Sequence, residues 1–239
     1  MPETPCPDAS GPPPAAEPDK VRRRATLLAR RRSLPAQTWE SEAVLLADRV
    51  VAACESAGVG ADASVCAYVP MRTEPGSTAM LDALRASGRR VLLPIVADPP
   101  GGVGSRDRAV DSPDDVGARG QAADCGRLGW ATYAGPGSLI AGPLGIRRPA
   151  GPDLGAAAIV DATLVLVPAL AVDLRGVRLG RGGGWYDRSL PLVRPGTVLL
   201  AVVRDEEVVD RLPSEPHDVP VTGVVTPTAG PRLFRPPLD

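Results

Sequence analysis

Apolar residues follow a helical spacing in the first quarter of the chain. Between residues 21 and 32, Leu27 and Leu28 stand among arginines, which predicts a short basic helix that ends before Leu34-Pro35. A second helix is expected after Thr38, a candidate N-cap, and before Gly58 and Gly60. The apolar positions expected to form its buried face are Val44, Leu45, Val50 and Val51.

The next segments alternate between strand and helix patterns. A short apolar run at residues 64–69 predicts a strand, and Ser77 can cap a helix that ends near Gly88. Residues 90–96 predict another strand. Strand, helix and strand in this order are typical of a parallel crossover.

Two continuous apolar runs, at residues 163–167 and 198–203, have the character of parallel strands buried on both faces. The glycine-rich segment 173–188 lies between them, so it is expected to leave the carboxyl end of a buried strand, where open α/β sheets bind ligands. A helix is expected at residues 185–192. The predicted fold is a single α/β domain with a mostly parallel, open, twisted sheet and helices on both faces, a Rossmann-like three-layer αβα arrangement.

The domain is expected to span residues 20–228. Residues 1–19 are rich in proline and predict a disordered tail, and residues 229–239 are expected to form a C-terminal tail. Residues 98–126 combine glycine, proline and aspartate without periodicity, which indicates a surface insertion or flexible loop.

Composition limits the classes of function. Of 239 residues, 44% are hydrophobic, enough for a real core, while 27 basic and 28 acidic residues leave a net charge of only -1. We therefore expect neither nucleic acid nor a membrane as a partner, and a nucleic-acid binder built on arginines 22–32 is the weakest alternative. Four dispersed cysteines without a CxxC pair, and no signal-like start or apolar stretch of about 20 residues, favour a reduced, cytoplasmic protein.

The segment 176–187, GVRLGRGGGWYD, is the strongest chemical signal in the chain. Consecutive glycines let backbone N–H groups converge on an anion, and the positive end of a following helix would favour the same place. Arg178 and Arg181 suit phosphate oxygens, and Asp187 supplies a carboxylate that could hold Mg²⁺. The spacing fits neither a Walker A loop nor GxGxxG. Taken alone, the run could also be a flexible loop with solvated arginines.

With its flanks, this segment resembles the 5-formyltetrahydrofolate cyclo-ligase family. The matching stretches are LVPALAVD at 166–173, the glycine-rich segment to Arg188, and LPSEPHDVPV at 212–221. Lys20 and Arg24 match the family's ATP-contacting helix, and YVPMRTEPG at 68–76 is similar to its folate-contacting strand and turn. Arg23, Arg148, Ala169, Val172 and Trp185 depart from the family's usual residues.

The resemblance implies an ATP- and Mg²⁺-dependent ligase. In this family ATP phosphorylates the formyl oxygen of 5-formyltetrahydrofolate, N10 then attacks, and phosphate leaves to give 5,10-methenyltetrahydrofolate. The partners implied are ATP and the folate, with or without additional glutamates, and we expect a monomer.

The resemblance also implies the site residues. Asp187 and Asp218 would hold Mg²⁺, and Arg181 and Asp187 would be catalytic. Folate would contact Val69, Glu74, Arg181, Gly183 and Trp185. ATP would be bound by Lys20, Arg24, Arg178, Leu179, Gly180, Arg181, Gly182, Gly183, Gly184, Trp185 and Tyr186.

Each assignment has a simpler alternative. Lys20 and Arg24 could solvate a helix face, and Glu74 and Asp187 could cap turns. His217, the single histidine, is expected to be structural or adjacent to a metal and not an acid–base catalyst. For the whole chain, the alternatives are a ligase with an altered substrate and a silent ATP- or folate-binding regulator.

Overall fold

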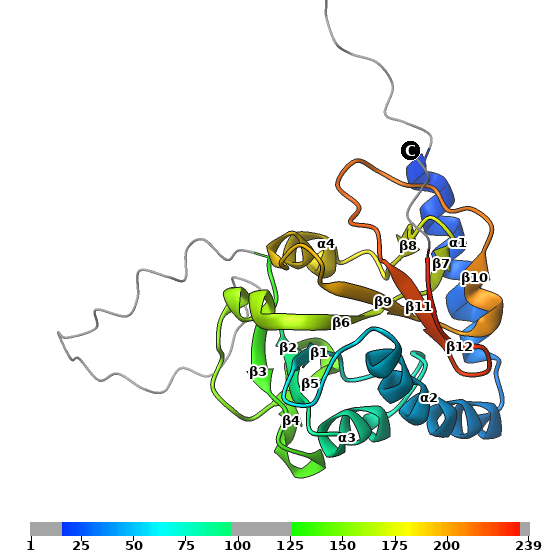
Figure 1. The fold of residues 1–239 in the computed structure, drawn as a ribbon. Helices are drawn as coiled ribbons and strands as arrows, with labels where there is room; N and C mark the ends of the chain where they lie inside the picture. Colours follow the sequence, from blue (N-terminus) through cyan, green and yellow to red (C-terminus); the bar gives the residue numbers. More distant parts are fainter. Residues whose placement is uncertain (1–15, 97–125, 235–239) are drawn as a thin grey trace, which may run out of the picture.

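A seven-stranded sheet forms the centre of the computed structural model, which describes residues 16–96 and 126–234 (Figure 1). In spatial order the strands are β12 (Gly230–Leu233), β11 (Gly223–Thr226), β9 (Val198–Val202), β6 (Ala162–Pro168), β1 (Ser64–Cys66), β2 (Arg90–Ile95) and β3 (Gly129–Thr132). The five inner strands are parallel, and the edge strands β12 and β3 are antiparallel to their neighbours. The predicted mostly parallel sheet is confirmed.

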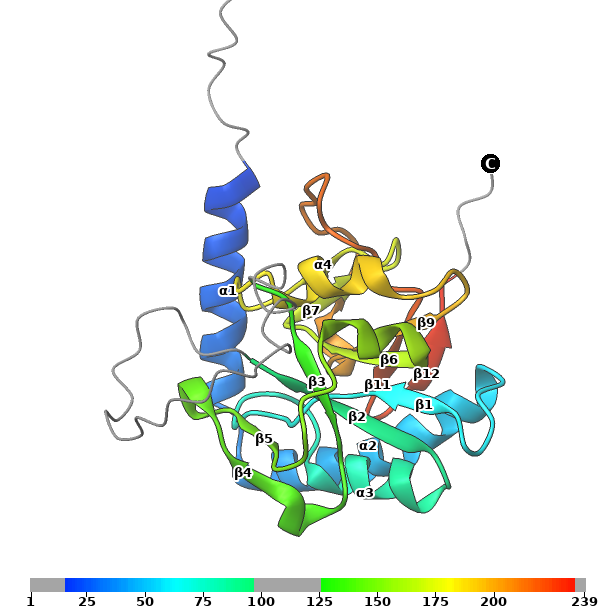
Figure 2. The ribbon, with the colours of Figure 1, turned by 90° about the vertical axis from the view of Figure 1, so that its left-hand side faces the viewer.

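Helices cover both faces of this sheet, as predicted. On one face lie α2 (Ala36–Ser56) and α3 (Thr78–Ala86), and on the other lies α4 (Trp185–Ser189) with the 3-10 turns Ala156–Asp161 and Leu190–Leu192 (Figures 1 and 2). The first helix, α1 (Ala16–Arg32), stands at one side of the molecule (Figure 2). No helix in these two described stretches is long and apolar enough to cross a bilayer.

Two small sheets accompany the main one. One has the order β10 (Val208–Val209), β7 (Ala171–Asp173) and β8 (Arg178–Leu179), and the other pairs β4 (Leu139–Ala141) with β5 (Arg147–Pro149). The fully buried Asp173 carboxylate holds the β7–β8 turn by accepting the N–H groups of Arg175 at 2.9 Å and Val177 at 3.1 Å. The glycine-rich loop therefore follows this hairpin and does not leave β6 directly, which corrects our expectation.

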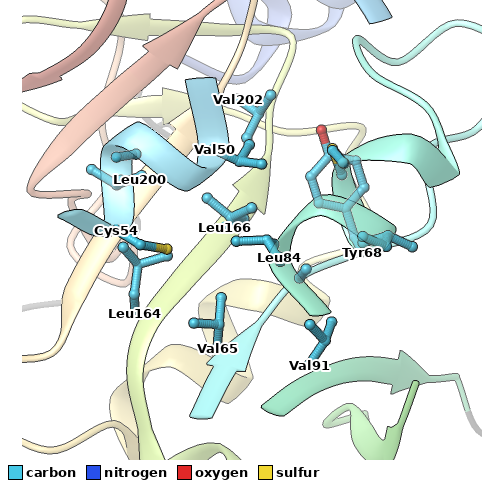
Figure 3. Packing of buried hydrophobic residues seen from close by; sticks show 14 of the residues in the cluster. Val50, Cys54, Val65, Tyr68, Leu84, Val91, Leu164, Leu166, Leu200 and Val202 are labelled. Carbon is cyan, nitrogen blue, oxygen red and sulfur yellow. The ribbon is translucent and has the colours of Figure 1, made fainter. Parts of the chain in front are cut away.

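The core between α2, α3 and the sheet consists mainly of aliphatic side chains, with Cys54, Met80, Tyr68 and Tyr133 among them (Figure 3). Leu164 and Leu166 of β6 meet Val50 and Cys54 of α2, and all four are fully buried. This packing places the carboxyl ends of β1 and β6 at a fixed position below the site.

The buried face of α2 differs from the expected one. Leu46, Val50, Ala53 and Cys54 are buried, at the i, i+4, i+7, i+8 spacing of one helix face, whereas Val44 is 68% exposed. Leu45 is also exposed, and the helix begins at Ala36 after Pro35, so Thr38 lies inside the first turn and does not cap it. By contrast, Ser77 caps α3 as predicted, accepting the Ala79 N–H at 3.2 Å.

Regular secondary structure extends into both predicted tails. Residues 16–19, expected in the N-terminal tail, are helical, and residues 230–233, expected in the C-terminal tail, pair as β12 with β11. Residues 1–15 and 235–239 of the predicted tails, and residues 98–125 of the predicted insertion, lie outside the described residues.

Candidate active site

Every residue predicted to contact ATP, folate or Mg²⁺ lines one cavity of about 450 Å³. These predicted residues come from four segments distant in sequence: α1, the turn after β1, residues 178–187 and residues 215–218. The cavity lies beyond the carboxyl ends of β1 and β6, the edge where open α/β sheets bind ligands. Its volume is in the range of small-molecule sites.

The glycine-rich loop presents unpaired backbone donors to this cavity. Gly182 and Gly184 have φ values of +101° and +64°, a region that favours glycine. In the part of the chain that the structure describes, the N–H groups of residues 181–184 have no hydrogen-bond partner. Two carbonyls of the loop accept hydrogen bonds from arginines outside it. Arg24 Nε donates to Gly180 O at 3.0 Å, and Arg188 Nη2 donates to Gly183 O at 2.9 Å. Such a loop can accept an anion such as phosphate.

The helix after this loop is shorter than predicted. It comprises only residues 185–189, and Pro191 lies in the 3-10 turn that follows it. In its first turn, Asp187 Oδ1 lies 2.6 Å from Arg178 Nη2 and 3.5 Å from the Val219 N–H. The Asp187 carboxylate is therefore paired with the nearly buried Arg178 guanidinium, which also donates to Val219 O.

Lys20 reaches from α1 into a pair of carboxylates. Its Nζ lies 2.9 Å from Asp218 Oδ2 and 3.1 Å from Glu215 Oε2, and the side chain is 7% exposed. Burial lowers the pKa of Lys20, but its hydrogen bonds to Asp218 and Glu215 outweigh this and leave the pKa above its ordinary value. For Asp218, burial raises the pKa, but the hydrogen bond from Lys20 outweighs this and brings the pKa below its usual range. Both groups are charged near neutral pH.

Three potential metal ligands meet at the same place. One donor atom each of Glu215, His217 and Asp218 lie within 4.8 Å of one another. The carboxylates suit Mg²⁺, which prefers oxygen ligands, better than the largely exposed imidazole does. Asp187, expected beside Asp218, lines the same cavity but is bonded to Arg178. Sequence reasoning missed Glu215 as a site residue, although it shares a proline-rich turn with Asp218.

Glu74 is a buried carboxylate in the cavity wall. Its Oε2 accepts the Met71 N–H at 2.9 Å, and its Oε1 accepts Arg181 Nε at 3.0 Å. Arg181 also donates through Nη2 to Thr73 Oγ1 at 2.5 Å. The two predicted substrate-binding charges, Glu74 and Arg181, are thus in direct contact.

The cavity also has an apolar wall that sequence reasoning largely missed. Val69 and Trp185 were predicted there, and the structure adds Pro94, Val96, Leu128 and Ile146. Nothing in the sequence separates apolar residues of a cavity wall from those of a core. Tyr186, whose buried hydroxyl has no partner among the described residues, also lines the cavity.

The departures from the family pattern lie mostly outside the cavity. Val172 is fully buried in the core, Arg148 lies on β5, and Arg23 is exposed and contacts Asp19 and Arg211 O. Ala169 and Trp185 do line it. The differences at Val172 and Arg148 therefore do not alter the wall directly.

Comparison with known proteins identifies the family of this chain. The sequence model of the 5-formyltetrahydrofolate cyclo-ligase family matches residues 16–227. The chain belongs to this family. A 5-formyltetrahydrofolate cyclo-ligase from Mycolicibacterium smegmatis is 42% identical over 211 residues, which cover 88% of this chain and 95% of that protein.

Solved structures of cyclo-ligase relatives share the fold. The 5,10-methenyltetrahydrofolate synthetase of Aquifex aeolicus superposes with a TM-score of 0.65 at 23% identity, covering 92% of this chain and 95% of that one. The synthetase of Mycoplasma pneumoniae superposes with a TM-score of 0.58 at 15% identity, covering 86% and 97%.

Proposed function

We propose that this cyclo-ligase family member uses ATP to convert 5-formyltetrahydrofolate to 5,10-methenyltetrahydrofolate, with release of ADP and phosphate. The observation that carries the proposal is the meeting, in one cavity, of a glycine-rich loop with unpaired N–H groups and a buried carboxylate, Glu74, beside an apolar wall. The first feature suits a triphosphate and the second a reduced pterin.

ATP would bind along the glycine-rich loop. The N–H groups of residues 181–184 would donate to phosphate oxygens, and the guanidinium groups of Arg24 and Arg178 lie beside the loop to offset the phosphate charge. Lys20 would approach from α1. The nucleotide would also contact Leu179, Trp185 and Tyr186, which line the same cavity.

The pterin ring would bind at Glu74. A carboxylate can accept two adjacent N–H donors, which a pterin offers, and burial strengthens such hydrogen bonds. Val69 and the Trp185 ring would supply apolar and stacking surface. The Tyr186 hydroxyl, which lacks a partner among the described residues, would donate to a bound ligand.

Asp218 and Glu215 would hold Mg²⁺, because their oxygens are close together and both face the cavity. When bound, Mg²⁺ supplies positive charge to the phosphates. Since the Lys20 ammonium now bridges these carboxylates, it would turn toward a phosphate oxygen when the ion binds. Asp187 would orient Arg178 and remains a predicted ligand of the ion.

The residues then act mainly by alignment and by charge. The formyl oxygen attacks the γ-phosphorus, and the bond to the β-phosphate oxygen breaks to release ADP. Arg181 already contacts Glu74, the carboxylate proposed to bind the pterin. It would stabilise negative charge on the transferred phosphoryl group. N10 next attacks the activated formyl carbon and loses its proton, and inorganic phosphate leaves with the former formyl oxygen.

The test is absorbance of the methenyl product while the protein is mixed with 5-formyltetrahydrofolate, ATP and Mg²⁺, each omitted in turn. A rise that requires ATP and the folate supports the reaction, and its dependence on Mg²⁺ tests the metal proposal separately. Binding of ATP without product would favour a ligase with an altered substrate. Binding of neither ligand would favour a silent relative.

We further infer that the protein acts in the cytoplasm. Cys54 and Cys66 are buried free thiols, which suits a reducing compartment, and burial raises the pKa of both.

A further inference from the structure

Helix α1 contacts two separate parts of the site. Lys20 and Arg24, in its first half, reach the 215–218 turn and the glycine-rich loop. Arg31 lies in its last turn, 11 residues after Lys20, which is roughly 16 Å along a helix. Because a helix moves as a rigid unit over this length, a displacement at one end is transmitted to the other.

Arg31 is buried and makes several close contacts, although it has no role in the site as described above. It is 1% exposed, and its Nε and Nη2 each lie 2.7 Å from a carboxylate oxygen of Glu207. Nη2 also donates to Ala169 O at 2.8 Å, and Nη1 donates to Thr73 O at 3.1 Å. Ala169 lines the cavity, and Thr73 precedes Glu74.

In the turn at residues 72–75, only Glu74 and Pro75 are buried. This turn separates the active-site cavity from a second cavity of about 620 Å³, and Met71 and Glu74 line both. With a cavity on each side, this turn is positioned in part by polar contacts. Among the described residues, the side chains that donate hydrogen bonds to this turn are Arg181, Arg31 and Tyr68, whose hydroxyl donates to Pro75 O at 3.3 Å.

We propose that Arg31 is a positioning residue that couples ATP binding on α1 to folate binding at Glu74. The inference rests on the proposed function, because it requires a nucleotide at Lys20 and Arg24 and a folate at Glu74. ATP would fix the position of the first half of α1. This would preserve the hydrogen bond from Arg31 to Thr73 O and keep the turn in the conformation that binds the pterin. Folate binding would order the turn and hence the helix.

Such coupling is reciprocal and measurable. Each ligand should tighten the other by the same factor, and factors of about 5 to 150 are typical of coupled sites. The quantity to measure is the dissociation constant of 5-formyltetrahydrofolate, with and without saturating non-hydrolysable ATP analogue and Mg²⁺. The ratio of the two constants is the coupling factor.

The decisive variant is Arg31→Met combined with Glu207→Gln, which removes both buried charges and leaves neither unpaired. We expect the coupling factor to fall from about fivefold or more to below about twofold, while the constant for ATP analogue alone changes little. The matched control is Arg30→Met, which precedes Arg31 on α1 and loses only an exposed contact with Glu206 at 3.6 Å. It should keep the wild-type factor.

Hydrogen exchange on the unmutated protein tests the same coupling without any variant. Folate alone should slow exchange of backbone amides at residues 24–32 as well as at 71–74. Slowed exchange at 71–74 with no change at 24–32, or a double variant that folds and keeps the wild-type factor, would overturn the proposal. If 5-formyltetrahydrofolate does not bind the wild-type protein, the proposed function fails instead.

Discussion

Replacing Arg181 by methionine should separate catalysis from stability. Methionine keeps much of the apolar stem of Arg181 but removes the hydrogen bonds to Glu74 and Thr73, at 3.0 and 2.5 Å. If Arg181 stabilises charge on the transferred phosphoryl group, its loss should resemble the loss of one oxyanion donor. We expect kcat to fall by about 10² to 10³.

The same substitution should have only a modest effect on the free energy of unfolding. A hydrogen bond to a charged group contributes about 1.5–3 kcal/mol, and solvent reduces this because the Arg181 side chain is 35% exposed. Glu74 keeps the Met71 N–H as a partner at 2.9 Å. We therefore expect the free energy of unfolding to fall by about 1–2 kcal/mol, or roughly 2–8 °C in Tm for a chain of this size.

Arg175→Met is the matched control. Arg175 lies on the β7–β8 hairpin, just before the glycine-rich loop that carries Arg181, and donates to Asp173 Oδ2 and Leu212 O at 2.7 and 2.8 Å, but it does not line the cavity. Thermal unfolding and methenyl absorbance at saturating substrates should show a similar loss of Tm and nearly normal kcat. Wild-type kcat in Arg181→Met, or an equal loss of kcat in Arg175→Met, would refute the assigned role.

Three further predictions concern the metal, the charge balance and the core. Glu215→Gln should raise the Mg²⁺ concentration needed for half-maximal binding of an ATP analogue, by on the order of tenfold; an unchanged titration would remove Glu215 from the metal site. Burial raises the pKa of Asp205, but hydrogen bonds from Thr226, Ala229 and Thr228 bring it below 3.8. Its stabilisation is therefore present above pH 3.8 and lost as the pH falls below it. Asp205→Asn should cost about 1 kcal/mol in urea unfolding at pH 7 and less near pH 3, and a constant difference would contradict this. Leu166→Ala should lower the free energy of unfolding by about 2–5 kcal/mol, measured by the same method, with little change in KM. A loss below 1 kcal/mol would mean that the surrounding core closes around the smaller side chain.

The elements that the sequence predicted well are those whose signal is local. Residues 164–167 and 198–202 contain only apolar side chains, and they lie in the adjacent central strands β6 and β9. Ser77 with the buried residues Met80, Leu81 and Leu84 specified α3 completely. In each case the periodicity and the boundary residues agree.

The missed elements depend on contacts that no local pattern encodes. Strands β7, β8 and β10 have two or three residues each, too few for a period to appear. They are joined by Asp173, whose Oδ2 accepts the Leu212 N–H at 3.0 Å from 39 residues away. In α2, both Val44 and Leu46 are apolar, and only the position of the sheet decides that Leu46 is buried.

The same distinction applies to the site. The glycine-rich loop and its arginines could be recognised because backbone freedom and charge are concentrated in about 12 residues. Arg31 could not, because in the sequence it is one of three consecutive arginines at the end of a basic helix. Arg30 remains 57% exposed at its side chain while Arg31 is 1% exposed and contacts three backbone or carboxylate groups. Their different roles arise from a rotation of about 100° around the helix, which turns one guanidinium to solvent and the next toward the buried Glu207.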